Sequence, residues 1–259
     1  MNNPVFTARV KKVLRENYRV TTIEMDAAIG ALPGQFLMIW IPGVGERPMS
    51  IGNSDPLTIS VANVGKVSDA ISRLKVGGLV SYRGPLGKPF TVPERTKRIL
   101  VVGGGYGVVP MYFLARRAKE SGIEAVGVIG AKIAKDLVYE KHLFAVCKEI
   151  FVTTDDGSRG KKGTVMAEAE WLVESRRFDC VYACGPERMM RAVALLCLKH
   201  KVPCEVSVER YMKCGLGVCG SCAMNGKLVC SDGPVFTAVE ALALGDFGTT
   251  RRDATGKKC

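Results

Sequence analysis

Residues 101–110 read Val-Val-Gly-Gly-Gly-Tyr-Gly-Val-Val-Pro, between the apolar stretch Arg98–Val102 and the helical stretch Tyr106–Lys119. A strand that runs through glycines into a helix can cradle a phosphate, because glycines let a ligand approach the backbone and the helix dipole favours negative charge. A tight strand–helix turn without a ligand is the other explanation of this run. The candidate ligand contacts in the turn are Gly103, Gly104, Gly105 and Gly107.

Strands and helices alternate downstream of these glycines. We expect strands at Ala125–Gly130, Ile150–Thr154, Asp179–Cys184 and Glu205–Val208, and helices at Thr164–Glu174 and Glu187–His200. Such alternation is typical of a parallel sheet wrapped by helices. The sequence therefore predicts an α/β domain over residues 96–206.

Two further segments of this domain bear on ligand binding. Residues 129–132 read Ile-Gly-Ala-Lys at the end of the second strand, where the usual dinucleotide fold places an acidic residue against the ribose, so NAD and NADP both stay open. Cys184 ends a later strand, and Gly185 and Pro186 then open a helix. The Cys184 thiol is either close to the reactive ring of a ligand or a buried core residue.

Residues 1–95 show a different pattern, in which short β-branched and aromatic runs alternate with turn signals such as Leu32-Pro33-Gly34. The expected strands are Val5–Leu14, Tyr18–Met25, Gln35–Ile41, Leu57–Ala62 and Gly78–Arg83, with one helical insert at Ser68–Leu74. Five or six short strands of this kind predict a small antiparallel β-barrel.

Two groups of residues in this first domain are candidate anion contacts. Arg47 and Ser50 stand at the start of an expected strand, and an arginine with a nearby hydroxyl suits a phosphate. Gly65, Lys66 and Ser68 open the helical insert, where a helix N-terminus attracts negative charge. Each signal is weak when taken alone.

Four cysteines near the C-terminus, Cys214, Cys219, Cys222 and Cys230, have the spacing C-x4-C-x2-C-x7-C. Plant-type [2Fe–2S] proteins use C-x4-C-x2-C followed by a more distant cysteine. Intervening glycines allow a loop to wrap a compact inorganic core and to aim amide N–H groups at sulfur. Zinc is the alternative, but structural zinc sites usually show two short C-x2-C pairs and only one is present. The sequence therefore predicts a [2Fe–2S] domain over residues 207–259.

The composition of the chain limits its size class and the kinds of molecule that it is expected to bind. The chain has 259 residues, 47% of them hydrophobic, which suits two medium domains with a small appendage. Its formal net charge of +12 is typical of nucleic-acid binders, yet cluster thiolates and a bound dinucleotide would offset part of it, and the basic residues are scattered. The exception is the basic end, which is either a solvated terminus or a docking segment for an acidic partner and contains Arg251, Arg252, Lys257 and Lys258.

The start of the chain, MNNPVFTARV, has no apolar signal core, and no run of about 18 apolar residues is present. We therefore expect a cytoplasmic protein without a membrane span. The six cysteines outside the cluster motif are then expected to be core thiols rather than disulfides.

The order of these motifs resembles the ferredoxin–NADP reductase superfamily, and within it the chain is most similar to the electron-transfer subunits of dihydroorotate dehydrogenase. The resemblance rests on Arg-Pro-Met-Ser at residues 47–50, Gly-Pro-Leu-Gly at 84–87, the glycine run, Cys-Gly-Pro at 184–186 and residues 209–222 and 229–236 around the cysteines. It covers essentially the whole chain. It implies an FAD-binding barrel, a nicotinamide-binding domain and a [2Fe–2S] domain.

The resemblance also assigns roles. It implies that Arg47, Pro48, Met49 and Ser50 hold the flavin, that Gly65, Lys66 and Ser68 face its pyrophosphate, and that Gly103–Gly107 with Cys184, Gly185 and Pro186 form the nicotinamide side.

It further implies that electrons pass between NAD(P)H, FAD and the cluster, to or from the FMN of a separate catalytic subunit that oxidises dihydroorotate in pyrimidine biosynthesis. The assembly is then a hetero-oligomer, such as a heterotetramer. We expect Tyr211, Leu216, Val218 and Met224 to lie at the subunit contact or to pack under the cluster loop. The alternative function is the flavin subunit of a ferredoxin-dependent NADP transhydrogenase or a soluble hydrogenase. A basic, cluster-bearing nucleic-acid binder is the alternative from a different class of function.

Overall fold

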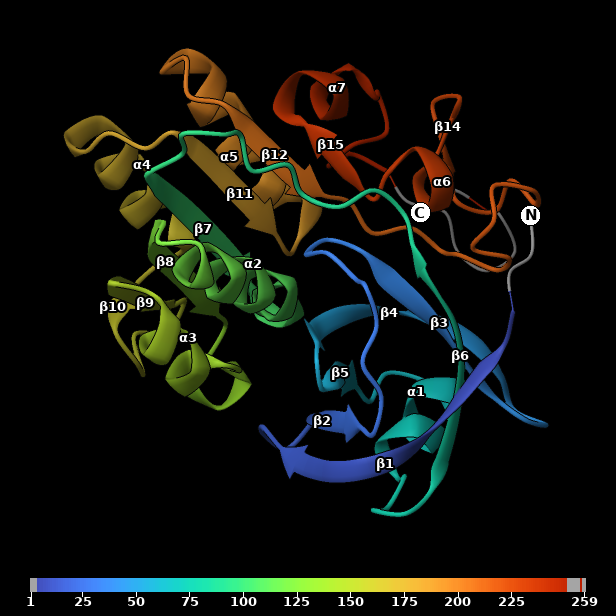
Figure 1. Cartoon of the computed structure of the whole chain (residues 1–259). Helices are drawn as coiled ribbons and strands as arrows, with labels where there is room; N and C mark the ends of the chain where they lie inside the picture. The colour runs from blue at the N-terminus through green and yellow to red at the C-terminus, as the bar shows by residue number, and fades with distance from the viewer. Residues whose placement is uncertain (1–3, 251–256, 258–259) are drawn as a thin grey trace.

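The computed structural model describes residues 4–250 and 257 and contains a closed barrel beside an open sheet (Figure 1). Arg251, Arg252 and Lys258 of the basic end lie outside the described residues, so the prediction about that segment stays a prediction.

The barrel is antiparallel, with strand order β1-β2-β5-β4-β3-β6 and closure by pairing of β1 with β6. β5 buries every second residue, as expected for a strand with one side in a core, whereas β2 and β3 are buried along most of their length. The short helix α1 (Lys66–Ser72) joins β5 to β6. The strands are β1 (Phe6–Arg15), β2 (Val20–Met25), β3 (Phe36–Ile41), β4 (Gly45–Ser54), β5 (Leu57–Ala62) and β6 (Leu79–Leu86).

The open sheet has the order β10-β9-β8-β7-β11-β12-β15, and all its pairs are parallel except the last. Its strands are β7 (Arg98–Gly104), β8 (Glu124–Ala131), β9 (Glu149–Thr154), β10 (Lys161–Lys162), β11 (Cys180–Cys184), β12 (Cys204–Ser207) and β15 (Val235–Thr237).

Helices cover both faces of this sheet (Figure 1). The helices α2 (Val108–Glu120) and α3 (Glu140–Val146) share one apolar core with it, and α4 (Val165–Ser175) and α5 (Glu187–Lys199) share the other. The inner strands β7 and β8 are buried along nearly their whole length, as in sheets that helices cover on both sides. Two short 3₁₀ helices, η1 (Gly105–Gly107) and η2 (Ala134–Asp136), follow β7 and β8.

The C-terminal segment returns to the sheet after the cysteine motif. It forms the hairpin β13 (Ala223–Met224) and β14 (Lys227–Leu228), then α6 (Val229–Asp232), β15 and α7 (Ala238–Ala243). β15 pairs antiparallel with β12, and Thr237 and Glu240 cap α7 reciprocally, which satisfies donors at its start.

The predicted fold class, a β-barrel with a parallel-sheet α/β domain and a small C-terminal cysteine domain, is confirmed. The predicted boundary at residue 206 falls in β12, and β15 pairs with this strand, so the C-terminal segment packs on the sheet. Within the part of the chain that the structure describes, no helix has the length and apolar composition that crossing a bilayer requires.

Candidate functional site

The two predicted nicotinamide loops lie against each other. They follow the neighbouring parallel strands β7 and β11, whose carboxyl ends meet at one edge of the sheet. A Cβ at Gly107 would lie 2.2 Å from the carbonyl oxygen of Cys184, and one at Gly185 would lie 2.7 Å from that of Gly104. Two backbones this close leave room only for glycine, so the loops form one glycine-lined edge.

Cys184 is half-buried at this edge, and its sulfur lies 3.8 Å from the carbonyl oxygen of Ser207. Burial raises the pKa of the Cys184 thiol to about 12. The group therefore stays neutral near pH 7 and can contact a ring without adding charge, but it is not an activated nucleophile.

Strand β4 connects this edge to the cysteine motif. At its start, the guanidinium of Arg47 lies 5.1 Å from the centre of the Tyr211 ring, which leads into the motif. Further along β4, a Cβ at Gly52 would lie 3.1 Å from the Val109 side chain, just after the glycine run. Pro48, Met49 and Ser50 lie between these contacts, so a group bound along β4 would span the two regions.

The predicted pyrophosphate contacts on α1 divide into two kinds. Ser68 is buried, and its hydroxyl accepts the backbone N–H groups of Val64 and Gly65 and donates to the Gly65 carbonyl. Its hydrogen bonds close its own turn, so we expect Ser68 to shape the loop rather than to bind a phosphate. Gly65 and Lys66 are exposed and remain candidate contacts.

The cysteine motif forms a loop whose backbone N–H groups point at sulfur. Leu216 N donates to Cys214 Sγ at 3.3 Å, and Gly217 N donates to Cys230 Sγ at 3.2 Å. Amide donors of this kind stabilise thiolates that carry a metal. The loop needs glycine to turn this way: φ is +71°, +74° and +70° at Gly215, Gly217 and Gly220.

The four thiols of the motif interact with one another. The Cys219 thiol interacts with Cys214, and hydrogen bonds led by those from Ser221 lower its pKa. The Cys230 thiol interacts with Cys222, and burial raises its pKa. A [2Fe–2S] cluster takes two thiolates on each of two irons, whereas one zinc ion would need all four together. Among residues 4–250 and 257, no group of three or more such side chains is placed to hold one metal ion. The fit to the cluster rests on the spacing of the cysteines and on the amide donors to sulfur.

The cysteine loop is anchored on both neighbouring units. Arg83 of β6 makes two hydrogen bonds to the Glu46 carboxylate, at 2.9 and 2.7 Å, and donates to the Cys214 carbonyl oxygen at 3.0 Å. On the other side, Arg210 forms a buried ion pair with Glu187, the first residue of α5 after Pro186.

Sequence reasoning missed these anchors, because Arg83 and Glu187 are far from the cysteines in the chain. The bidentate geometry becomes visible only in the fold. The run Glu209-Arg210-Tyr211 lies directly before the cysteines, so the sequence could have indicated that Arg210 and Tyr211 contact the cysteine loop.

Two families match parts of the chain. An oxidoreductase NAD-binding domain matches residues 101–194, which include both glycine loops. The iron–sulfur cluster binding domain of dihydroorotate dehydrogenase B matches residues 209–241, which include the four cysteines of the motif.

Whole-chain relatives agree with these matches. A probable dihydroorotate dehydrogenase B (NAD(+)) electron transfer subunit from Methanopyrus kandleri is 46% identical over 230 residues, 87% of this chain and 86% of the relative. Its counterpart in Methanocaldococcus jannaschii is 37% identical over 100% of this chain and 99% of its own length. Among solved structures, an NADH-dependent reduced ferredoxin–NADP oxidoreductase is similar with a TM-score of 0.81 and 30% identity, covering 90% of this chain and 88% of that one.

Proposed function

Because this chain belongs to the family of dihydroorotate dehydrogenase B electron transfer subunits, we propose that it passes electrons between NAD(H), FAD and a [2Fe–2S] cluster, to or from the FMN of a separate catalytic subunit. The observation that carries the proposal is the path along β4, which reaches from the glycine-lined edge to the cysteine loop. The reaction that it serves, oxidation of dihydroorotate, belongs to pyrimidine biosynthesis.

The residues present fit these groups. Gly103–Gly107 with Cys184, Gly185 and Pro186 would hold the nicotinamide dinucleotide, β4 would hold the flavin, and Cys214, Cys219, Cys222 and Cys230 would bind the irons. When bound, the flavin exchanges a hydride with nicotinamide and the cluster carries single electrons, so that a two-electron donor is linked to a one-electron carrier. The protein supplies position: Arg83 and Arg210 hold the cysteine loop between the barrel and the sheet.

The side chain of Arg47 is expected to bind the flavin or its pyrophosphate. It has one hydrogen bond, to the Glu46 carbonyl, and its other donors suit a phosphate. A hydrogen bond to a charged group contributes about 1.5–3 kcal/mol, so Arg47→Ala should weaken FAD retention roughly 10- to 100-fold. Flavin absorbance after extensive dialysis measures this. Arg9→Ala removes another barrel arginine as a control, and equal flavin content in all three proteins would contradict the role.

A partner surface is available next to the cluster. Val218 and Leu216 are 80% and 44% exposed on the cysteine loop, and the Cys219 thiol is exposed between them and Ser221. Exposed apolar side chains beside a redox group suit a lasting contact, which buries apolar area. Met224 is fully buried, which favours the expected alternative that it packs under the loop. We propose that this surface meets an FMN-containing dehydrogenase in a hetero-oligomer.

The proposed division of the reaction between this chain and the FMN subunit is directly testable. The purified chain should reduce an artificial dye with NADH yet show no dihydroorotate oxidation, and adding the FMN subunit should restore dihydroorotate-dependent NAD reduction. Dihydroorotate turnover by the chain alone would contradict the proposal.

The alternative function is that of the flavin subunit of a transhydrogenase. The similarity to the ferredoxin–NADP oxidoreductase favours this alternative. Tight binding to a transhydrogenase subunit, with none to the FMN dehydrogenase, would select it. We also propose a cytoplasmic location, supported by the nine free thiols found among the described residues.

A further inference from the structure

A chain of hydrogen-bonded hydroxyl groups joins the barrel to the sheet domain, away from the glycine-lined edge and the cysteine loop. The hydroxyl oxygen of Tyr139, the residue before α3, lies 2.8 Å from Ser60 Oγ on β5. Ser60 Oγ lies 2.7 Å from Thr22 Oγ1 on β2, and Thr22 donates to Glu16 Oε1 at 2.8 Å. This hydroxyl chain therefore starts on the sheet domain and ends in the turn between β1 and β2.

The Glu16 carboxylate sets the direction of the hydroxyl chain. An ionised carboxylate only accepts hydrogen bonds, and a hydroxyl group has a single proton to donate. Thr22 donates to Glu16, so it accepts from Ser60. Ser60 has then used its own proton and accepts from Tyr139. Burial raises the pKa of Tyr139 to about 12, so its hydroxyl keeps the proton that this arrangement needs.

The backbone of Tyr139 has a rare conformation. Its φ is +60°, in the left-handed region that a tyrosine seldom adopts, and such a conformation persists only where the surroundings determine it. The His142 ring stacks on the buried Tyr139 ring with centroids 4.5 Å apart, and Tyr112 of α2 contacts both rings edge-on. His142 Nδ1 also lies 3.9 Å from Glu16 Oε2, so the ring cluster and the hydroxyl chain form one unit.

This unit lies next to the two elements that would carry the flavin and the nicotinamide. A Cβ at Gly52 of β4 would lie 3.5 Å from the Tyr139 hydroxyl oxygen and 3.1 Å from Val109 Cγ1. Val109 belongs to α2, the helix that begins directly after the glycine run. A shift of α2 against the barrel would therefore move the nicotinamide loops relative to β4.

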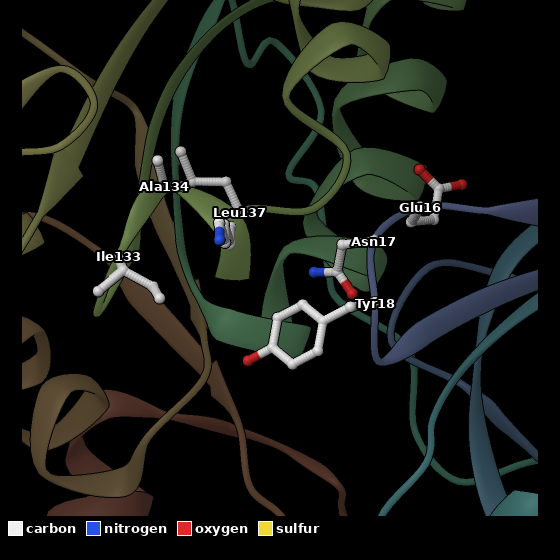
Figure 2. A pocket seen from close by; sticks show the side chains of 7 residues that line it. Glu16, Asn17, Tyr18, Ile133, Ala134 and Leu137 are labelled. Carbon is white, nitrogen blue, oxygen red and sulfur yellow. The ribbon is translucent and has the colours of Figure 1, made fainter.

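Other contacts between the barrel and the sheet domain are less directional or less protected from water. Phe113 of α2 is fully buried in the apolar core of the barrel, but apolar packing has no preferred direction. Next to Glu16, a pocket of about 580 Å³ lies between Tyr18 and Leu137 (Figure 2). The Tyr18 hydroxyl donates to Asp136 Oδ1 at 2.6 Å, but this bond is exposed and water competes for it.

We propose that Tyr139 is a positioning residue for hydride transfer. Through the hydroxyl chain it fixes the angle between the sheet domain and the barrel, and thereby the approach of a nicotinamide at the glycine-lined edge to a flavin on β4. Hydride transfer needs reacting atoms roughly 3–3.5 Å apart, so a small rotation between the two units affects the rate. The inference rests on the proposed function, because it requires nicotinamide and flavin on different units.

The first test measures the angle itself. Residual dipolar couplings of backbone amides in the full chain, loaded with FAD and the cluster, report the orientation of the barrel relative to the sheet domain. Tyr139→Phe removes one oxygen atom, keeps the ring and should change this orientation. Tyr82→Phe removes the hydroxyl of another buried tyrosine, on β6 and outside the hydroxyl chain, and should leave it unchanged. An unchanged orientation in Tyr139→Phe would overturn the proposal.

The second test measures hydride transfer, as the rate at which NADH reduces the flavin in a stopped-flow instrument. A displacement of about 1 Å can cost about 100-fold in rate, so a smaller rotation should lower the maximal rate in Tyr139→Phe roughly 10-fold. The NADH concentration at half-maximal rate, and flavin reduction by dithionite, should stay native. A lower melting temperature at native rates would show a purely structural role and would also overturn the proposal.

A second variant tests whether the hydroxyl groups act as one chain. Ser60→Ala interrupts the chain one step further along and should reproduce the loss of rate in Tyr139→Phe. The double variant should then be no slower than either single variant, because groups that act as a unit are not additive. Fully additive losses would contradict the hydroxyl chain. Failure of the native chain to reduce its flavin with NADH would instead refute the proposed function, while the orientation measurement would still test Tyr139.

Discussion

Replacement of Cys219 by serine is expected to abolish or strongly alter the [2Fe–2S] EPR signal of the reduced protein. Cys219 interacts with Cys214, and hydrogen bonds from Ser221 lower the pKa of its thiol to about 6, which favours the thiolate that an iron needs. Serine offers a harder and far less acidic ligand, and the iron that needs both cysteines would lose one of them. Iron content and EPR of anaerobically purified protein measure the result.

Cys147→Ser is the matched control for this experiment. Burial raises the pKa of the Cys147 thiol to about 12, and the residue lies at the end of α3, away from the cysteine loop. Its replacement should leave the signal intact. A full complement of zinc without iron in the native protein would contradict the cluster assignment altogether.

A methyl group at Gly107 is expected to reduce NADH-dependent dye reduction roughly 100-fold, since displacing a reacting group by about 1 Å can cost that much. The new Cβ would lie 2.2 Å from the Cys184 carbonyl oxygen and 2.5 Å from the Gly185 nitrogen, both of them backbone atoms that cannot rotate away. The two loops would have to separate, and the nicotinamide would lose its position.

The cluster reports whether Gly107→Ala acts locally. With dithionite as reductant, its EPR signal should match that of the native protein. Gly30→Ala adds a methyl group where no atom lies within 4 Å and should leave both measurements unchanged. Native rates with NADH in Gly107→Ala would show that the two loops do not form the nicotinamide site.

The sequence predicted most of the features that depend only on residues close together in the chain. The cysteine motif and the glycine run carry their signals within a few residues, because each forms a single loop. The alternation of strands and helices predicted which elements follow one another along the sheet domain for the same reason. β4 was seen only as the start of a strand around Arg47, and β15 was missed because three residues of strand leave almost no periodic pattern.

What the sequence could not predict depends on contacts between distant segments. Arg47 was expected at the flavin, but nothing local places its guanidinium over the Tyr211 ring as well. Ser68 has the residue type of a phosphate contact, yet its own turn uses its hydroxyl. Tyr18 is separated from Asp136 by more than a hundred residues, so the pocket between them exists only once the barrel closes beside the sheet.

The return of the chain to β12 through β15 makes the cysteine segment an insertion within one β-hairpin. Ser207 pairs with Val235, so residues 208–234 leave the sheet and re-enter it at adjacent backbones. A loop with its ends joined in this way loses less entropy on ordering than a free tail of the same length, and its buried residues share the apolar core of the sheet. The place of the iron site relative to the barrel and the sheet is therefore set by this strand pairing and by Arg83 and Arg210, and does not depend on the irons themselves.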